Sequence, residues 1–132
     1  MALIYNKIAI IGTGMIGASI ALASRRAGLA TVLAGYDADS TAMSDVAALQ
    51  LVDEVATSAA AAVIDADLVI MAVPVGVVGT VAETIVSHMK PGAVLTDTGS
   101  TKRSVLRDVA PHLNETIIWS VSYTHLTLPT KD

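Results

Sequence analysis

Three glycines near the amino terminus have the spacing G-x-G-x-x-G, which can bring backbone amides close to a phosphate group. They are Gly12, Gly14 and Gly17. They follow the apolar run at residues 8–11 directly, and helix-favouring residues continue to position 27. The first glycine permits a tight strand-to-helix turn, the second lets backbone approach a pyrophosphate, and the third lets the helix pack close to the strand. The N–H groups and positive dipole end of that helix would face the phosphates, so the motif predicts a pyrophosphate site.

An acidic residue follows at the distance that a dinucleotide-binding fold requires. A second apolar run, residues 31–36, ends in Asp37, which lies 20 residues beyond Gly17. A carboxylate there accepts hydrogen bonds from the adenosine ribose hydroxyls and repels a 2′-phosphate, which favours NAD over NADP. The alternative is a loop carboxylate that caps the next helix. Because strand, glycines, helix, second strand and acid are in register, we interpret the segment as a dinucleotide site.

The composition restricts the possible partners. The chain has 132 residues, a net charge of −4 and no run of Lys or Arg, which argues against nucleic acid. It has no cysteine, which excludes thiolate metal sites and is typical of a reducing compartment; we predict no metal site. The uncharged residues 8–24 resemble a signal peptide, but three glycines interrupt them and they are too short to span a bilayer. We therefore expect a cytoplasmic protein without a membrane partner.

The remaining apolar runs alternate between strand and helix patterns. Strands are expected over residues 8–11, 31–36, 54–56, 68–73, 93–96 and 117–119. Helices are expected over residues 15–27, 40–49, 58–64 and 77–89, and around Val105, Leu106, Val109 and Leu113. In the first helix, helical spacing predicts a buried stripe of Ile16, Ile20, Ala23 and Ala27. The alternation predicts an α/β fold, a Rossmann-type doubly wound and mainly parallel sheet.

Ligands of such sheets lie beyond the carboxyl ends of the strands. Three predicted loops meet there, at residues 12–17, 73–75 and 97–102. Pro74 in the second loop either lies beside the cofactor or simply ends its strand. In the third loop Ser100 and Thr101 precede Lys102 at a helix start, a combination that suits an anionic substrate. Serine and threonine are also ordinary helix caps, so the residues alone leave both interpretations open.

Four segments resemble the N-terminal domain of prephenate and arogenate dehydrogenases, which are enzymes of tyrosine biosynthesis. These segments are residues 11–17, 35–37, 72–75 and 97–102, and the resemblance covers roughly residues 7–120. The first three recur in many β-hydroxyacid-type dehydrogenases. The last, Asp-Thr-Gly-Ser-Thr-Lys, is much more particular to this family, so it carries most of the resemblance.

The resemblance implies an NAD(P)-dependent oxidative decarboxylation of prephenate to 4-hydroxyphenylpyruvate by a protein that is a homodimer at full length, and Asp37 makes NAD the expected coenzyme. It implies that Ser100 is catalytic and lies near the substrate hydroxyl. By the same similarity, Asp37 would bind the ribose, and Val73 and Pro74 would flank the cofactor. The pyrophosphate would be held by Gly12, Gly14, Met15, Ile16 and Gly17.

The sequence departs from the family after residue 120. The family's Gly-His-Pro segment, which carries a catalytic histidine, is replaced by unrelated residues, and we assign no role to His125. The family's helical C-terminal domain is also missing. We expect a dinucleotide-binding domain at residues 1–120 and a tail at 121–132 that resembles translated sequencing-adapter DNA. Such a chain would be an inactive fragment. An arogenate dehydrogenase, another β-hydroxyacid-type dehydrogenase and a stand-alone NAD-sensing module remain alternatives.

Overall fold

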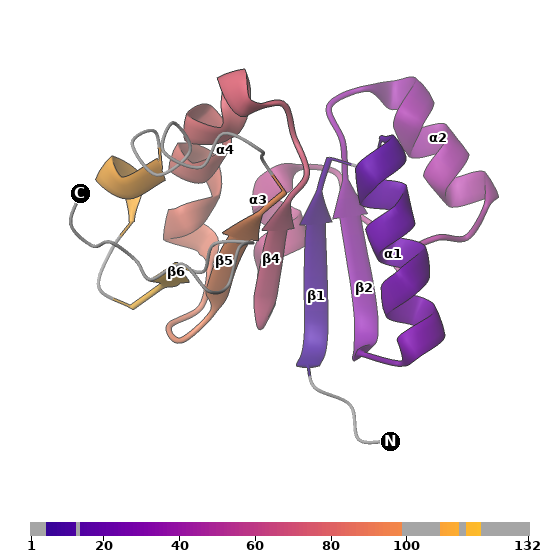
Figure 1. Cartoon of the computed structure of the whole chain (residues 1–132), viewed down its shortest axis with the longest axis horizontal. Helices are drawn as coiled ribbons and strands as arrows, with labels where there is room; N and C mark the ends of the chain where they lie inside the picture. Colours follow the sequence, from indigo (N-terminus) through magenta and orange to yellow (C-terminus); the bar gives the residue numbers. More distant parts are fainter. Residues whose placement is uncertain (1–4, 13, 99–108, 114–115, 120–132) are drawn as a thin grey trace.

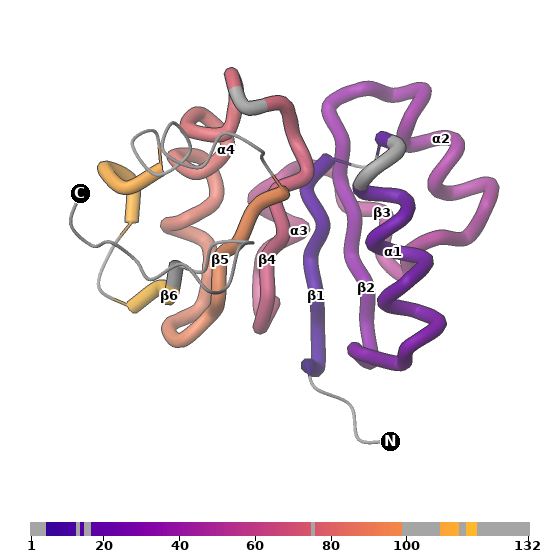
Figure 2. The backbone as a smooth tube through the Cα atoms, in the orientation of Figure 1, coloured from indigo at the N-terminus to yellow at the C-terminus, as the bar shows by residue number. Residues whose placement is uncertain are grey.

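A six-stranded parallel sheet forms the centre of the computed structural model, which describes residues 5–12, 14–98, 109–113 and 116–119 (Figure 1). The strand order is β3-β2-β1-β4-β5-β6. The strands are β1 Tyr5–Ile11, β2 Ala30–Tyr36, β3 Glu54–Val55, β4 Leu68–Met71, β5 Val94–Asp97 and β6 Ile118–Trp119. The chain runs outward from β1 to β3, returns through α3 to β4, and continues to β6 (Figure 2). This reversal places the switch point of the sheet between β1 and β4, and it confirms the predicted doubly wound α/β fold.

The helices cover both faces of this sheet. The α-helices are α1 Met15–Ala27, α2 Ser40–Ala48, α3 Ala59–Val63 and α4 Val78–Ile85. The described part of the chain also contains short 3-10 helices, η1 Val75–Val77, η2 Val86–His88 and η3 Ala110–His112. Residues of α1 and α2 share one core cluster with Ile8 and Ile10, whereas α3 and α4 share the other with Ala9 and Ile11. Strand β1 is therefore buried on both faces, as its uninterrupted apolar run predicted.

Helix α1 has the predicted bounds but buries a different stripe. Ala23 and Ala27, two of the predicted buried residues, are exposed, whereas Gly17, Ala21 and Ser24 face the sheet. The prediction is therefore wrong at Ala23 and Ala27 but holds at Ile20, which is partly buried against the core cluster that contains Ile8 and Ile10. The side chain of Ile16 lies outside what the structure describes. The start of α1 lies so close to β1 that a Cβ atom on Gly17 would collide with the Gly12 carbonyl oxygen. Small side chains are therefore required on the contacting face.

The other boundaries differ from expectation in a few places. Strand β4 ends at Met71, two residues early, and the helix expected over 77–89 is divided into η1, α4 and η2. The helix expected around residues 105–113 lies mostly outside the described residues, as does the proposed boundary at residues 120 and 121. In the part that the structure describes, no helix has the length and apolarity needed to cross a membrane, and no three metal-ligating side chains come together.

Candidate functional site: the glycine turn between β1 and α1

Gly12 occupies a position that no other residue could adopt without strain. Its φ angle is +96°, and its N–H donates a hydrogen bond of 2.7 Å to the Tyr36 carbonyl oxygen. A Cβ atom here would collide with the Ala72 carbonyl oxygen and would lie 2.9 Å from Cγ1 of Val73. The turn after β1 is therefore enclosed by the ends of both neighbouring strands, β2 and β4.

Gly14 and Gly17 face different surroundings. Gly17 is buried, and its Cβ would meet the Gly12 carbonyl, so this position serves packing. Gly14 is exposed, and nothing lies within 4 Å of the position its Cβ would take. Among the residues that the structure describes, none fills the space beside Gly14. A pyrophosphate that contacts the backbone there needs this space, so the turn fits a dinucleotide.

The start of α1 differs from those of α2 and α3. The Asp39 side chain caps α2 by accepting from Thr41 N at 2.8 Å, and Ser58 Oγ caps α3 by accepting from Ala61 N at 3.0 Å. The N-cap of α1 is Gly14, which has no side chain to accept a bond, and no acidic residue lies in the first turn. The helix therefore presents its positive end toward the space beside Gly14, which suits an anionic group.

Asp37 lies next to this turn because of the sheet register. Tyr36 pairs with Ile11, so Asp37 follows the carboxyl end of β2 just beside Gly12. Its Oδ1 atom accepts a hydrogen bond of 2.8 Å from Asp39 N, and its own N–H donates to the Met43 sulfur at 2.9 Å. The alternative interpretation, in which Asp37 caps the next helix, is not what the structure shows, since Asp39 is the cap of α2.

Strands β4 and β5 end at the same edge, where the other two predicted loops begin. Val73 is half-buried against Gly12, and Pro74 is exposed at the start of η1, where its carbonyl oxygen accepts from Val77 N at 3.0 Å. Ser100 lies outside the described residues. Asp97 at the end of β5 pairs with Met71 in register, so the chain enters the Ser100 segment beside the end of β4.

Two residues at this edge received no role from the sequence. Asp97 is 1% exposed, a carboxylate buried just before the Ser100 segment. Met43 contacts Asp37 from helix α2. Nothing in the sequence distinguishes Met43 from an ordinary core methionine. The only sequence signal for its contact with Asp37 is its place near the start of the helix that follows Asp37.

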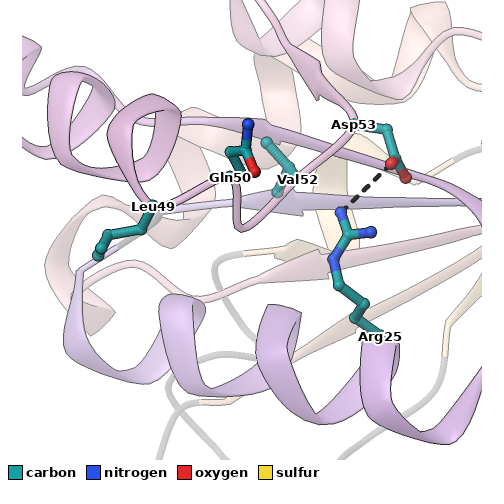
Figure 3. A pocket seen from close by; sticks show the side chains of 5 residues that line it. All are labelled: Arg25, Leu49, Gln50, Val52 and Asp53. Atoms are coloured by element: carbon teal, nitrogen blue, oxygen red, sulfur yellow. Dashed lines mark hydrogen bonds and ion pairs between the residues drawn. The ribbon is translucent and has the colours of Figure 1, made fainter.

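A separate surface cavity of about 440 Å³ lies between the end of α1 and the loop from α2 to β3. It is lined by Arg25, Leu49, Gln50, Val52 and Asp53 (Figure 3). Arg25 is ten residues beyond Met15, or about 15 Å along the helix axis, so the cavity is remote from the glycine turn. Its Nη2 atom lies 3.2 Å from Asp53 Oδ1, and Asp53 Oδ2 accepts from Leu33 N at 2.8 Å. These contacts tie α1 to the sheet edge and have a structural role.

The fold and the glycine turn together define a Rossmann-type nucleotide-binding domain. Residues 20–121 match the family described as the nucleotide-binding domain of prephenate dehydrogenase. Cyclohexadienyl dehydrogenase of Zymomonas mobilis is 36% identical over 115 residues, which are 87% of this chain and 39% of that protein. The chain belongs to the prephenate dehydrogenase nucleotide-binding domain family.

Solved structures agree with this assignment. Prephenate dehydrogenase from A. aeolicus, in complex with hydroxyphenyl propionate and NAD+, superposes with a TM-score of 0.78 at 27% identity, covering 90% of this chain and 42% of that chain. Arogenate dehydrogenase from Synechocystis has a TM-score of 0.71 at 28% identity, covering 80% of this chain and 37% of that one. The chain thus spans about two fifths of the length of these relatives.

Proposed function

We propose that this chain is the NAD-binding domain of a prephenate dehydrogenase, which converts prephenate to 4-hydroxyphenylpyruvate in tyrosine biosynthesis. The observation that carries the proposal is the open space beside Gly14 at the uncapped N-terminus of α1, in a turn whose Gly12 lies beside Asp37. Family membership and the likeness to a dehydrogenase solved with NAD+ support the choice of ligand.

The backbone at the start of α1 performs the main binding step in this proposal. The N–H groups of Gly14, Met15, Ile16 and Gly17 donate to the pyrophosphate, and Gly12 shapes the turn that aims them. They need little reorganisation, because the sheet and the close α1–β1 contact already hold them in place. The affinity therefore comes from a preorganised backbone rather than from charged side chains.

In this proposal Asp37 determines which coenzyme binds, and the neighbouring loops hold the coenzyme in position. The carboxylate accepts hydrogen bonds from the ribose hydroxyls of NAD and repels the 2′-phosphate of NADP. Val73 and Pro74 flank the coenzyme at the end of β4. When bound, NAD supplies the hydride acceptor for the reaction. We propose that Ser100 forms a hydrogen bond to the substrate close to its hydroxyl group. The reason is the position of Ser100 in the Asp-Thr-Gly-Ser-Thr-Lys motif.

The whole protein's activity requires more than coenzyme binding. Because the relatives are more than twice as long, we expect the 132-residue chain to bind NAD but to form little NADH from prephenate. We also propose that the full-length protein is a cytoplasmic homodimer that acts on a small-molecule substrate. Its charge of −4 and lack of cysteine are compatible with that compartment and with the absence of a nucleic-acid partner.

Arogenate is the alternative substrate. The likeness to an arogenate dehydrogenase is nearly as close as the likeness to prephenate dehydrogenase, with TM-scores of 0.71 and 0.78. Assays of the full-length gene product with prephenate, arogenate and small hydroxy acids would separate these activities. If the full-length product oxidises none of them yet binds NAD, a nucleotide-sensing role is favoured.

A Gly14→Ser substitution tests the proposed coenzyme site. The φ of −69° and ψ of −159° at Gly14 are open to any L residue, and serine is a good N-cap, so the variant should fold at least as well as wild type. Its side chain would occupy the phosphate space and its hydroxyl would compete for the helix N–H groups. Calorimetry should therefore show NAD binding weakened by about tenfold or more.

Gly28→Ser is the matched control at the opposite end of α1. Gly28 ends the helix with a φ of +65°, so serine there should cost about 1 kcal/mol of stability and leave NAD affinity unchanged. The two variants thus separate binding from folding. Equal NAD affinities for wild type and Gly14→Ser would contradict the proposed site.

A further inference from the structure

A single peptide unit connects the glycine turn to the acidic residue beside it. The carbonyl oxygen of Tyr36 accepts a hydrogen bond of 2.7 Å from Gly12 N. The N–H of the same peptide, which belongs to Asp37, donates to the Met43 sulfur at 2.9 Å. The Tyr36–Asp37 peptide is therefore held on both sides, by the turn after β1 and by helix α2.

The position of Met43 in α2 explains how its side chain reaches this peptide. Asp39 is the N-cap, and the N–H of Met43 makes the first backbone hydrogen bond of the helix, 3.1 Å to the Asp39 carbonyl oxygen. Helical side chains lean toward the N-terminus, so a long unbranched side chain here extends back over the first turn. The half-buried thioether thereby becomes the acceptor for a partly buried N–H group.

The orientation of this peptide determines where the Asp37 carboxylate points. Oδ1 is already directed by the 2.8 Å hydrogen bond from Asp39 N, so rotation of the Tyr36–Asp37 peptide would disturb both the backbone and the side chain. A carboxylate that accepts hydrogen bonds from two ribose hydroxyls must keep a defined orientation, because hydrogen bonds weaken steeply when they are misaligned.

We propose that Met43 is a positioning residue for coenzyme selection, holding the Tyr36–Asp37 peptide so that the Asp37 carboxylate faces the ribose and excludes a 2′-phosphate. The inference rests on the proposed NAD-binding function and adds a residue that does not touch the coenzyme. It predicts that discrimination between NAD and NADP depends on an acceptor atom at position 43 and not only on side-chain bulk.

Met43→Leu removes the acceptor while keeping a similar volume, and Met43→Gln retains an acceptor oxygen on an unbranched side chain. We would measure the binding of NAD and of NADP to the full chain by calorimetry. Met43→Leu should bind NAD about three to ten times more weakly, as expected for the loss of one hydrogen bond, with less than about a twofold loss for NADP. Met43→Gln should restore most of the NAD preference.

Met89→Leu is the control for the chemical change itself, because Met89 is 7% exposed in the other core cluster. It should leave both affinities at the wild-type values, and thermal melts of all variants would report any loss of folding. The inference is wrong if Met43→Leu matches wild type, if it weakens NAD and NADP equally, or if Met43→Gln behaves like Met43→Leu. If the wild-type chain binds no NAD, the proposed function fails first and this inference fails with it.

Discussion

Asp67 joins three strands at their amino ends, and removing its charge should destabilise the fold measurably. Its Oδ2 atom accepts hydrogen bonds from the N–H groups of Asn6 at 2.7 Å and Lys7 at 3.1 Å, both in β1. Its Oδ1 atom pairs with the Lys90 ammonium group. Its own backbone bonds with Lys7 in β1 and Val94 in β5. Asp67→Asn preserves the shape of the side chain, removes its charge and replaces one of its two acceptor oxygens with an NH2 group.

The expected loss follows from these contacts. The ion pair is partly exposed, with 39% of the Lys90 side chain and 24% of the Asp67 side chain accessible, so it contributes at most about 1 kcal/mol. Each of the two backbone hydrogen bonds to a charged acceptor is stronger than a neutral one by roughly 0.5 kcal/mol or more. Together these effects predict a destabilisation of about 1–2 kcal/mol, or a Tm lower by roughly 4–8 °C for a domain of this size.

The effect should disappear in acid. The hydrogen bond from Lys90 holds the pKa of Asp67 below its ordinary value of 3.8, with help from the Lys7 and Asn6 N–H groups and against burial, which raises it. A carboxyl whose folded pKa is depressed stabilises the fold above its unfolded pKa, and this contribution is lost as the pH falls through the folded value. The difference in Tm between wild type and Asp67→Asn should therefore be constant from pH 7 to about 5 and shrink below about pH 4.

Thermal melts followed by circular dichroism between pH 3 and pH 7 would measure this difference. Asp45→Asn provides a control, since Asp45 is an exposed carboxylate on α2 and should change Tm by less than about 2 °C. A Tm difference for Asp67→Asn that is the same at pH 3 as at pH 7 would refute the assignment of its stability to charge. An Asp67→Asn variant as stable as wild type at pH 7 would refute the role of Asp67 altogether.

Three further substitutions test how helix α1 is attached to the sheet. Gly17→Ala places a methyl group against the Gly12 carbonyl oxygen, so we expect a stability loss above about 1 kcal/mol in chemical denaturation together with weaker NAD binding; an unchanged denaturation midpoint would contradict the close contact. At the ion pair between Arg25 of α1 and Asp53, Asp53→Ala should cost more stability than Arg25→Ala. Asp53 also accepts a hydrogen bond from Leu33 N, whereas the exposed ion pair alone contributes under about 1 kcal/mol. Equal losses in urea denaturation would show that the ion pair is the only contribution.

Much of the fold could be predicted because its signals are local. The apolar run of β1, the glycine that ends α1 at residue 28, and the serine that caps α3 at residue 58 each determine the conformation of their own neighbours. The alternation of strand and helix patterns then leaves the doubly wound parallel sheet as the favoured arrangement. The spacing of the glycines and Asp37 likewise predicted which loops would meet, since the carboxyl ends of parallel strands share one edge.

The sequence by itself therefore determined the element types, the turn after β1 and the acidic residue beside it. Tertiary structure alone decided which side chains of α1 are buried, because the contact distance between α1 and β1 sets the size that each position tolerates. It also decided the partners of Asp67, which lie about 60 residues away in β1, and the contact of Met43 with Asp37. Such contacts depend on how folded elements meet in space, and no residue pattern along the chain directly encodes the distance between two elements.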